Sequence, residues 1–546
     1  MRLRLPLAAL GLSLAAGCAP SMPDVVEALP VEPTPTAPAL TPATLDDPEL
    51  VQRYQATITP SELAGHLYVY ADDYMGGRET GEAGQRFAAK YLAGQYQAMD
   101  IGPKGTGADN GNYGLDAYLQ PFELETKRTV RQTITAMRGD EVAFASELAE
   151  GSAGPYPLVS IYGTVEDASS APIVYGGYAS DEELAGLDLD GAYVLLQAGT
   201  PDDPADRSQL QPRAMKAGAA GARAVIFPLA PAAEALAARA ANTLNGGRLA
   251  LPADGADSDG DELPPIFGTG VDIANAIVDG DVMTAEPGAT PHTLQVVNET
   301  EGSRVPTENV LAYIEGSDLS DEVIVISAHL DHIGIEDGEG DVINNGADDD
   351  GSGTISLLEI AEAFKMAKDE GHGPRRSILF LHVTGEEKGL LGSAYYADRE
   401  PVLPLASTVA NLNIDMIGRH DPSYEGRDEP YVYVIGAELI STDIDEINTN
   451  VNAATGLGLD LSKRYNSPDD PNRFFARSDH WNFGKHEIPF IFYFTGTHED
   501  YHQPGDEADK IDYDRMAQIS RLVFGTAWQI ANQDARPGVS GVGFNP

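Results

Sequence analysis

The stretch Ile326–Gly353, ISAHLDHIGIEDGEGDVINNGADDDGSG, decides how the rest of this chain is interpreted. The β-branched run 323–326 predicts a strand that delivers His329 and Asp331 at its end. A glycine-rich loop then places three consecutive acids directly before a helical pattern: Asp348, Asp349 and Asp350. Imidazole and carboxylate groups at a strand end, followed by carboxylates at a helix start, indicate a divalent-metal site.

From Thr307 onward, short apolar runs alternate with helical patterns. The candidate strands are Asn309–Ile314, Glu322–Ala328, Ser377–Thr384, Val409–Asp415, Tyr431–Ile435 and Pro489–Thr495. The candidate helices are Thr354–Lys368, Leu390–Ala397, Ile444–Ala454 and Tyr513–Gln533. This alternation predicts an α/β fold, with a mostly parallel mixed sheet flanked by helices.

Polar residues of metal-ligand type stand at the ends of four predicted strands. They are His329, the pair Glu386–Glu387, Asp415, and the segment His498–Asp506 with His502 in it. A single acid after a strand usually caps a helix. Repetition at several strand ends instead favours a common site, because ligands gather beyond the carboxyl ends of parallel strands.

The part of the chain before residue 307 shows two different sequence patterns. From Ser61 the pattern is helical, with Phe87, Tyr91, Leu92 and Tyr96 at helical spacing, and Tyr118–Leu124 predicts a strand. Between 132 and 301, short apolar runs alternate with loops rich in Gly, Ala and Asp. This region contains no His, Cys or acid constellation with ligand spacing, so we expect an inserted domain without a metal site.

Composition limits the class of function. The chain has 546 residues, and its 85 Asp+Glu against 35 Lys+Arg give a formal charge of -50. Such a charge repels phosphate backbones and anionic lipid surfaces, so nucleic-acid binding is not expected. The acidic excess itself is interpreted chiefly as a source of solubility.

The N-terminus has the pattern of an export signal. A positive start, Met1–Arg4, precedes the apolar run Leu5–Ala16, which is too short to span a bilayer. Cys18 follows in a bacterial lipobox-like context and is the chain's single cysteine. We therefore expect export, with a lipid on Cys18 anchoring the protein at the periplasmic side of a membrane or at the cell surface. An ordinary secretory signal is the alternative.

Six motifs together resemble peptidase family M28, a family of zinc peptidases. They are AHLDHIG, NNGADDDGSG, TGEEKGLLGS, NIDMIG, RSDHWNF and HEDYHQPGDE. The resemblance covers 307–533 strongly and 61–124 weakly, and it implies the zinc-dependent exopeptidase (phosphorylase/hydrolase-like) fold. GAYVLLQAG, KAGAAGARAVIF and LPPIFGTG in the insertion resemble the β-rich protease-associated (PA) domain.

These patterns divide the chain into six expected parts. They are a signal peptide (1–17), a lipidated Pro-rich tether (18–48), the N-terminal part of the peptidase domain (49–131), a PA-like inserted domain (132–301), the main peptidase domain (302–534) and a C-terminal tail (535–546).

The family resemblance implies two Zn2+ ions per chain and a role for each matching residue. Asp349 would bridge the ions, with His329 and Asp415 on one and Glu387 and His502 on the other. Glu386 would act as general base. Asp331 would orient the ligating imidazole of His329. Asp348 and Asp350 are expected to shape the loop.

Other polar residues are expected to play lesser parts. Ser478, Asp479 and His480 are too close in sequence to form a hydrolase triad. Asp506 is a candidate support for His502. Six histidines are expected to be structural or at the surface: His332, His372, His382, His420, His486 and His498. Four residues are candidates for the substrate pocket: Tyr465, Arg473, Phe475 and Arg477.

The resulting hypothesis is a dizinc exopeptidase that acts on peptides, most simply an aminopeptidase that releases N-terminal residues. One alternative is a glutaminyl-cyclase-like acyltransferase, whose relatives resemble the same core but use one zinc. Another is a glutamate-carboxypeptidase-like exopeptidase, for which Arg473 or Arg477 could hold the substrate carboxylate. A non-catalytic binding protein is disfavoured by the complete ligand set.

Overall fold

The computed structural model describes residues 45, 47–107, 114–150, 156–200, 203, 207, 209–229, 248–252, 263–424, 430–467, 470 and 472–540. The expected signal peptide, Cys18 and most of the expected tether lie outside the described residues. At the end of the tether, Asp47 caps helix α1 (Pro48–Gln55), accepting a hydrogen bond from the main-chain N–H of Leu50 at 3.0 Å. In the described ranges, no helix has the length and apolar character needed to cross a membrane.

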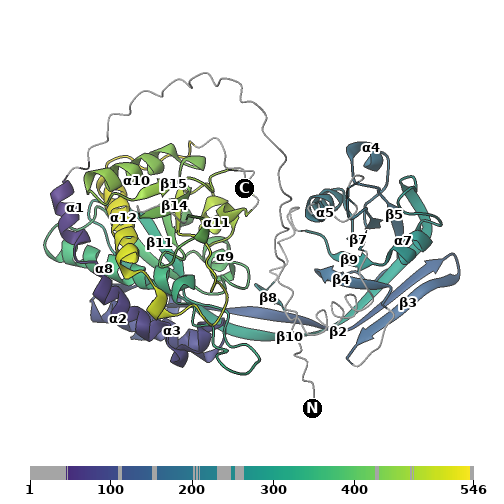
Figure 1. Cartoon of the computed structure of the whole chain (residues 1–546), viewed down its shortest axis with the longest axis horizontal. Coiled ribbons are helices and arrows are strands. Elements are labelled where there is room, and N and C mark those ends of the chain that lie inside the picture. Colours follow the sequence, from purple (N-terminus) through teal and green to yellow (C-terminus); the bar gives the residue numbers. More distant parts are fainter. Residues whose placement is uncertain are drawn as a thin grey trace, which may run out of the picture. The chain divides into compact units, whose positions relative to one another are not determined.

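A mixed sheet forms the centre of the C-terminal part (Figure 1). Its strands are, in spatial order, β15 (Asp460–Ser462), β14 (Tyr431–Gly436), β16 (Phe490–Phe494), β13 (Thr408–Ile414), β11 (Leu319–His329), β12 (Arg376–Val383) and β10 (Gly288–Ile314). Strands β16, β13, β11 and β12 run parallel, whereas β14 and β10 are antiparallel to their neighbours β16 and β12. The predicted fold class, a mostly parallel mixed sheet between helices, is confirmed.

Alternation along the strands determines which face of the sheet each helix covers. In β11, Ile324 and Ile326 belong to one buried cluster, and Val323 and Val325 belong to another. The first cluster also includes residues of α1, α2 (Pro60–Tyr70), α3 (Ala83–Ala98), α8 (Gly353–Asp369), α10 (Thr442–Ala454) and α12 (Tyr513–Asn532). The second includes Phe483 of α11 (Trp481–Gly484), and the short helix α9 (Leu391–Ala394) leads into Tyr396 of the same cluster. Both faces are therefore buried, as a parallel sheet requires.

Most predicted elements agree with the structure to within three residues. Three differ. The strand predicted at Asn309–Ile314 is the end of the much longer β10, and the strand predicted at Tyr118–Leu124 is the start of the 20-residue β2 (Leu119–Arg138). The helix predicted at Leu390–Ala397 is α9 followed by a wider helical turn, Tyr395–Arg399. In α3 the predicted apolar face is only partly correct, since Leu92 and Tyr96 are buried but Phe87 is exposed.

The region between the N-terminal helices and the main sheet is built on a long two-stranded ribbon (Figure 1). Strand β2 (Leu119–Arg138) pairs antiparallel with β10, and the expected boundaries at 131/132 and 301/302 fall inside these strands. The remaining strands are β1 (Gly102–Pro103), β3 (Glu141–Ala149), β4 (Leu158–Tyr162), β5 (Ala171–Tyr175), β6 (Tyr193–Leu195), β7 (Ala224–Pro228), β8 (Arg248–Ala250) and β9 (Ile266–Thr269). The helices are α4 (Asp181–Leu184), α5 (Leu210–Ala219) and α7 (Val271–Ile277). The insertion has its own buried clusters, so it carries its own core.

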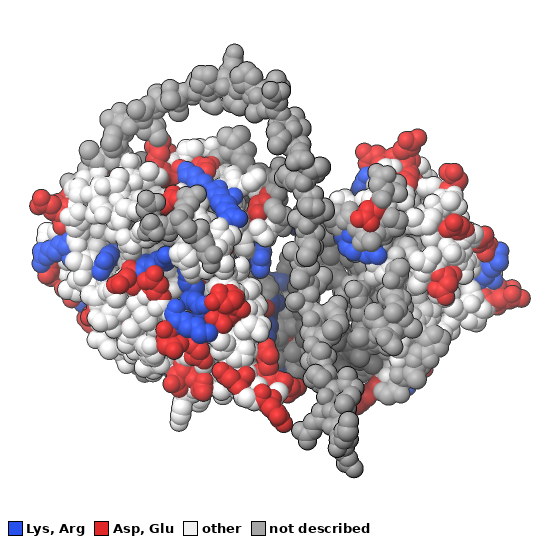
Figure 2. Space-filling view, viewed as in Figure 1, with Lys and Arg blue, Asp and Glu red and all other residues white. Residues whose placement is uncertain are grey.

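Acidic side chains are distributed rather than concentrated over the face drawn in Figure 2. Several stand beside Lys or Arg in this view. The described chain also forms ion pairs between acids and bases, such as that of Arg375 with Asp318. This distribution fits the interpretation that the acidic excess supports solubility.

Helix α8 contains a buried acid remote from the predicted metal site. Glu359 is 2% exposed, its Oε1 lies 3.6 Å from His66 Nε2, and its Oε2 has no hydrogen-bond partner among the described residues. Burial, reinforced by the charges of Glu62 and Glu362, raises the pKa of Glu359 from 4.5 to about 8. At neutral pH the folded protein therefore holds this carboxyl as a neutral acid.

This acid predicts a pH-dependent stability. The folded state keeps the Glu359 proton up to about pH 8, whereas the unfolded chain releases it near pH 4.5. The stabilisation is complete below pH 4.5 and is lost as the pH rises toward 8. Glu359→Gln has no proton to lose, so its free energy of unfolding relative to wild type is expected to rise between pH 5 and 9 by on the order of 4 kcal/mol.

Denaturant titrations at several pH values measure this difference. The matched control is Glu362→Gln on the same helix, which is half-buried and is expected to change the pH dependence less. A pH-independent difference between Glu359→Gln and wild type would contradict the assignment.

Candidate metal centre and active site

Four neighbouring parallel strands end at one edge of the sheet, and each is followed by candidate ligands. Strand β11 ends at His329, and β12 leads into Gly385 and the Glu386–Glu387 pair. Asp415 follows β13 directly, and the loop after β16 carries His502. The carboxyl ends of these strands meet, so residues that are 173 positions apart in sequence lie in one cluster.

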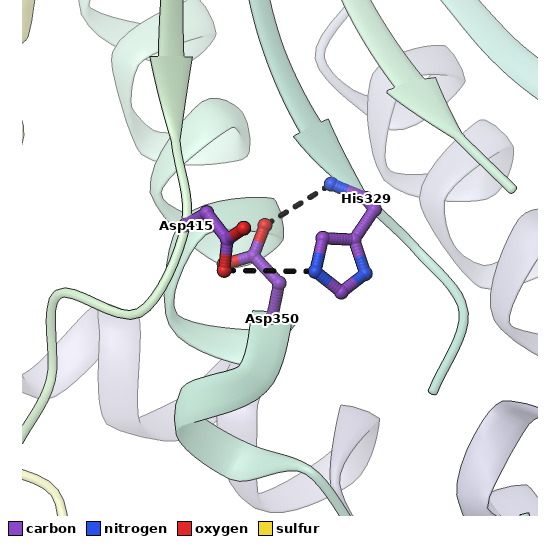
Figure 3. A group of neighbouring side chains, drawn as sticks. All are labelled: His329, Asp350 and Asp415. Carbon is purple, nitrogen blue, oxygen red and sulfur yellow. Dashed lines mark hydrogen bonds and ion pairs between the residues drawn. The ribbon is translucent and has the colours of Figure 1, made fainter. Parts of the chain in front are cut away.

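The first half of the cluster forms around the imidazole of His329. Its Nε2 lies 3.2 Å from Asp349 Oδ1 and 3.6 Å from Asp415 Oδ1. Figure 3 shows the side chains of His329 and Asp415 turned toward each other from their two strand ends. This arrangement offers one nitrogen and two oxygens to a single ion.

Asp350 also lies beside this group, but its carboxylate is already engaged. Oδ2 accepts the main-chain N–H of His329 at 3.0 Å, as drawn in Figure 3. Oδ1 accepts the N–H of Gly353 at 2.9 Å and that of Met416 at 3.2 Å. Because these bonds hold the backbone of three ligand-bearing segments, we assign Asp350 to the loop framework and not to the ligand set.

The second half of the cluster uses the other oxygen of Asp349. His502 Nε2 lies 3.1 Å from Asp349 Oδ2 and 3.2 Å from Glu387 Oε2. The two carboxylate oxygens of Asp349 thus face two different imidazoles, those of His329 and His502. A carboxylate placed in this way can bridge two cations.

The donor set fits zinc in number, type and spacing. Tetrahedral coordination at about 2.0–2.2 Å puts neighbouring ligand atoms about 3.3–3.6 Å apart. The separations in both groups are 3.1–3.6 Å. In addition, Nε2 of His329 and Nε2 of His502 are buried without a hydrogen-bond partner in the described part of the chain. Two buried nitrogens facing carboxylates without hydrogen-bonding to them are positioned to bind metal.

The charges within the cluster determine which groups are ionised. Burial alone would raise the pKa of Asp349, but contacts with the His329 and His502 imidazoles hold it well below its usual range. Burial likewise opposes the low pKa of Glu387, which the hydrogen bond with His332 and the contact with the His502 imidazole bring to about 2. Burial raises the pKa of Glu386 well above its usual value, and the neighbouring charges of Glu387 and Asp415 add to it. Of the two adjacent glutamates, one is therefore a fixed anion and the other favours holding a proton.

Asp331 lies at the site but makes different contacts from those expected. Nδ1 of His329 is 3.1 Å from the main-chain carbonyl of Asp331 and 3.8 Å from its carboxylate. The carboxylate accepts hydrogen bonds from Thr80 Oγ1 at 2.7 Å and from the main-chain N–H of Glu386 at 3.3 Å. Asp331 thus orients His329 chiefly through its backbone, and its side chain holds the turn that carries Glu386.

Two further residues differ from expectation. His332, which was expected to be structural or at the surface, is buried in the site with Nδ1 2.7 Å from Glu387 Oε1. Its place three residues after His329 was the signal that could have identified it. Among the described residues, no hydrogen bond joins Asp506 to His502; the Asp506 carboxylate instead accepts the main-chain N–H groups of Asp348 and Asp349. Both residues support groups of the metal cluster.

The segment Ser478–His480 is not a hydrolase triad. Ser478 Oγ donates to Asp415 Oδ2 at 2.7 Å, whereas Asp479 accepts from Ser393 and His480 Nε2 lies 2.9 Å from the Phe475 carbonyl. The three side chains thus face different partners. Ser478 orients a proposed metal ligand, in the way that groups around metal sites commonly do.

A pocket opens beside the cluster. Its walls are Asp349, Glu386, Asp415, Met416, Phe474, Arg477, Phe492, Phe494, Thr497, Tyr501 and His502. Of the four residues expected in a substrate pocket, Arg477 lines it, whereas Tyr465, Arg473 and Phe475 do not. Tyr465 belongs to the aromatic cluster that includes Phe474 and Phe494. The pocket is therefore carboxylate-rich at the cluster and largely aromatic elsewhere.

Comparison with known proteins identifies the family. The family model described as peptidase family M28 matches residues 309–527. Aminopeptidase YwaD of Bacillus subtilis is 24% identical over 68% of this chain and 70% of its own length. The uncharacterized protein YfbL of Escherichia coli is 30% identical over 39% of this chain and 68% of its own. The chain belongs to peptidase family M28.

This M28 member is a zinc-dependent exopeptidase, as the sequence predicted. A solved structure of an aminopeptidase from Aneurinibacillus sp. strain AM-1 superposes with a TM-score of 0.50 at 18% identity, covering 92% of this chain and 98% of that one. That likeness supports the fold over almost the whole chain.

The ligand assignment predicts the metal content of single variants. His502→Ala should lose one of two zinc ions, because its Nε2 faces both Asp349 and Glu387. His332→Ala should keep both ions, because His332 hydrogen-bonds the Glu387 oxygen that faces away from His502. Zinc per chain after dialysis, measured by atomic emission, checks both.

His498→Ala is the control, since His498 lies in the same loop as His502 but contacts Asp348 at 3.3 Å. Loss of an ion from His332→Ala, with His502→Ala unchanged, would assign the second imidazole ligand to His332.

Proposed function

We propose that this M28 exopeptidase is a two-zinc aminopeptidase that releases N-terminal residues from peptides. The observation that carries the proposal is the position of Asp349 between the imidazoles of His329 and His502. With Asp415 on one side and Glu387 on the other, each ion would receive three protein ligands. Three ligands would leave a coordination position open for water and substrate.

Glu386 is the proposed general base. Its Oε2 lies 4.0 Å from His329 Nε2, and it lines the pocket beside Asp349. Bound zinc would lower the pKa of water from about 15.7 to about 7 and polarise the peptide carbonyl. Glu386 takes the proton of the attacking water and gives it to the leaving amine. Its raised pKa supports this second role, since an acid must hold the proton before it can deliver it.

The pocket supports cleavage next to a free N-terminus. Asp349, Glu386 and Asp415 line one side of the pocket, so a terminal residue seated in it would place its peptide bond beside the proposed ions and base. The apolar walls, which include Met416, Phe474, Phe492 and Phe494, suit an apolar side chain on the residue to be released.

Two features predicted from the sequence remain part of the proposal. The first is export through residues 1–17 with lipid attachment at Cys18, supported by the n-region, the apolar run and the single cysteine. The second is a PA-like inserted domain, supported by a separate core in which β5, β6, β7 and β9 pair in parallel.

Substitution of the two adjacent glutamates separates their roles. Glu386→Gln should keep both zinc ions but lose turnover by roughly 10²–10⁴-fold, because the amide cannot accept the proton. Glu387→Gln should instead weaken zinc binding, because it removes a ligand charge from the second ion. Steady-state kinetics and zinc analysis on the same preparations measure both, and unchanged turnover in Glu386→Gln would refute the assigned base.

The direction of cleavage is tested with Arg477, the arginine among the pocket's walls. An aminopeptidase should hydrolyse aminoacyl anilides, which lack a carboxylate, and Arg477→Leu should change that activity less than about tenfold. N-acetylated peptides should not be cleaved. A carboxypeptidase would instead cleave the N-acetylated peptides. Arg477→Leu would then abolish that cleavage, since the Arg477 cation would hold the terminal carboxylate of the substrate. One zinc per chain with cyclisation of N-terminal glutamine would instead indicate the cyclase reaction.

A further inference from the structure

Arg78 is a buried cation outside the matched family region. Its side chain is 0% exposed. Nε donates to the carbonyl of Leu330 at 3.1 Å, Nη1 donates to those of Asn345 at 2.5 Å and Tyr70 at 3.3 Å, and Nη2 donates to that of Gly346 at 2.9 Å. The guanidinium also lies 4.6 Å from the ring centre of Tyr70. All its nitrogens are thus engaged by main-chain oxygens.

The carbonyls that Arg78 binds belong to the two segments that carry proposed metal ligands. Leu330 stands directly after His329, and Gly346 stands three residues before Asp349. These ligands face each other at 3.2 Å, so their separation depends on how the two segments are held. One planar guanidinium joins the two segments, because its donors point in fixed directions.

The backbone at Arg78 adopts a conformation that is unfavourable for a residue with a side chain. Gly76, Gly77 and Arg78 all have positive φ values of 55°, 64° and 49°. Glycine adopts this region freely, whereas other residues do so at a penalty. A Cβ on Gly77 would overlap the carbonyl of Gly334, and Gly77 in turn accepts the N–H of Gly334 at 3.0 Å. The turn is therefore pressed against the segment that follows the His329 strand.

The charge of Arg78 is also unusual, because it has no acidic partner. Among the described residues, no carboxylate forms an ion pair with it, although a buried charge is costly unless it is compensated. Its charge is compensated by four main-chain carbonyl oxygens, three of which belong to the segments that carry His329 and Asp349.

We propose that Arg78 is a positioning residue for the zinc centre: it fixes the separation of the His329 and Asp349 segments. The inference rests on the proposed ligand set. A purely structural role, as a link between the N-terminal helices and the sheet, is the competing explanation. The two differ in what a substitution does to zinc affinity in protein that remains folded.

Arg376 provides a matched control. It is 1% exposed, and it donates to Glu322 at 2.5 Å and to the carbonyls of Ile530 at 2.7 Å and Gln533 at 2.6 Å. It stands at the start of β12, whereas the metal cluster lies at the other end of that strand. Arg376 therefore joins the chain's segments as Arg78 does, but far from the ligands.

The experiment compares Arg78→Lys with Arg376→Lys in the full-length chain. Zinc affinity is measured by competition with a chelator, and folding is monitored by circular dichroism and by Tm. Both variants should have a lower Tm than wild type. Arg78→Lys should also weaken zinc binding by about 10–100-fold, as substitutions of the groups that orient metal ligands commonly do. Arg376→Lys should stay within about twofold of wild type, and excess zinc should restore part of the turnover of Arg78→Lys.

A second variant protects the test against failure to fold. Tyr70→Phe removes the hydroxyl that donates to the same Leu330 carbonyl at 2.8 Å, and it should weaken zinc binding by a few fold. Unchanged zinc affinity in Arg78→Lys and Tyr70→Phe would overturn the inference. His329→Ala distinguishes failure of the Arg78 inference from failure of the proposed ligand set. If His329→Ala loses zinc and Arg78→Lys does not, only the role of Arg78 is refuted. If His329→Ala retains its zinc, the proposed ligand set is refuted.

Discussion

The contacts of one carboxylate, Asp349, determine how the rest of the site must be built. Its two oxygens lie 3.2 Å from His329 Nε2 and 3.1 Å from His502 Nε2, so neither is free to hold the surrounding loop. Other acids do that instead. Asp506 accepts main-chain N–H groups from the acidic loop, and Asp350 accepts three N–H groups from three segments. The run of three acids in the loop is thus divided between metal binding and structure.

Burying so many carboxylates is possible because each has a specific partner. An isolated buried anion would be protonated or would destabilise the fold. Asp506 and Asp350 accept hydrogen bonds from main-chain N–H groups. The proposed ligands Asp349 and Glu387 face imidazoles. A chain of buried polar groups also reaches Asp415 from inside the sheet: Asn411 donates to Ser327, Ser327 to Asn413, Asn413 to Ser478, and Ser478 to Asp415. Burying polar groups inside a sheet is unfavourable unless they are hydrogen-bonded. Here each of these side chains is hydrogen-bonded, and the chain of bonds ends at this proposed ligand.

The sequence predicted the elements that local pattern determines. Strand and helix positions followed from apolar runs, and the ligand-bearing strand ends followed from the rule that parallel strands share an edge. Contacts between distant segments could not be predicted in this way. Spacing alone did not distinguish Asp349 from Asp350, because the difference lies in which backbone groups each one meets. The same limit explains His332 and Asp506, whose partners are 55 and 157–158 residues away.

The N-terminal segment shows why the family match from 309 to 527 understates the functional unit. Thr80 donates to the Asp331 carboxylate, which itself holds the N–H of Glu386. Glu79 accepts from Lys388, two residues after that glutamate, at 2.8 Å. The segment 78–80 therefore contacts Asp331, which holds the backbone of the proposed base, and Lys388, which follows that base. It also contacts the carbonyls of Asn345 and Gly346, just before the proposed bridging Asp349. Because a metal site tolerates little error in ligand position, a segment more than 200 residues from the ligands in sequence is part of the chemistry it supports.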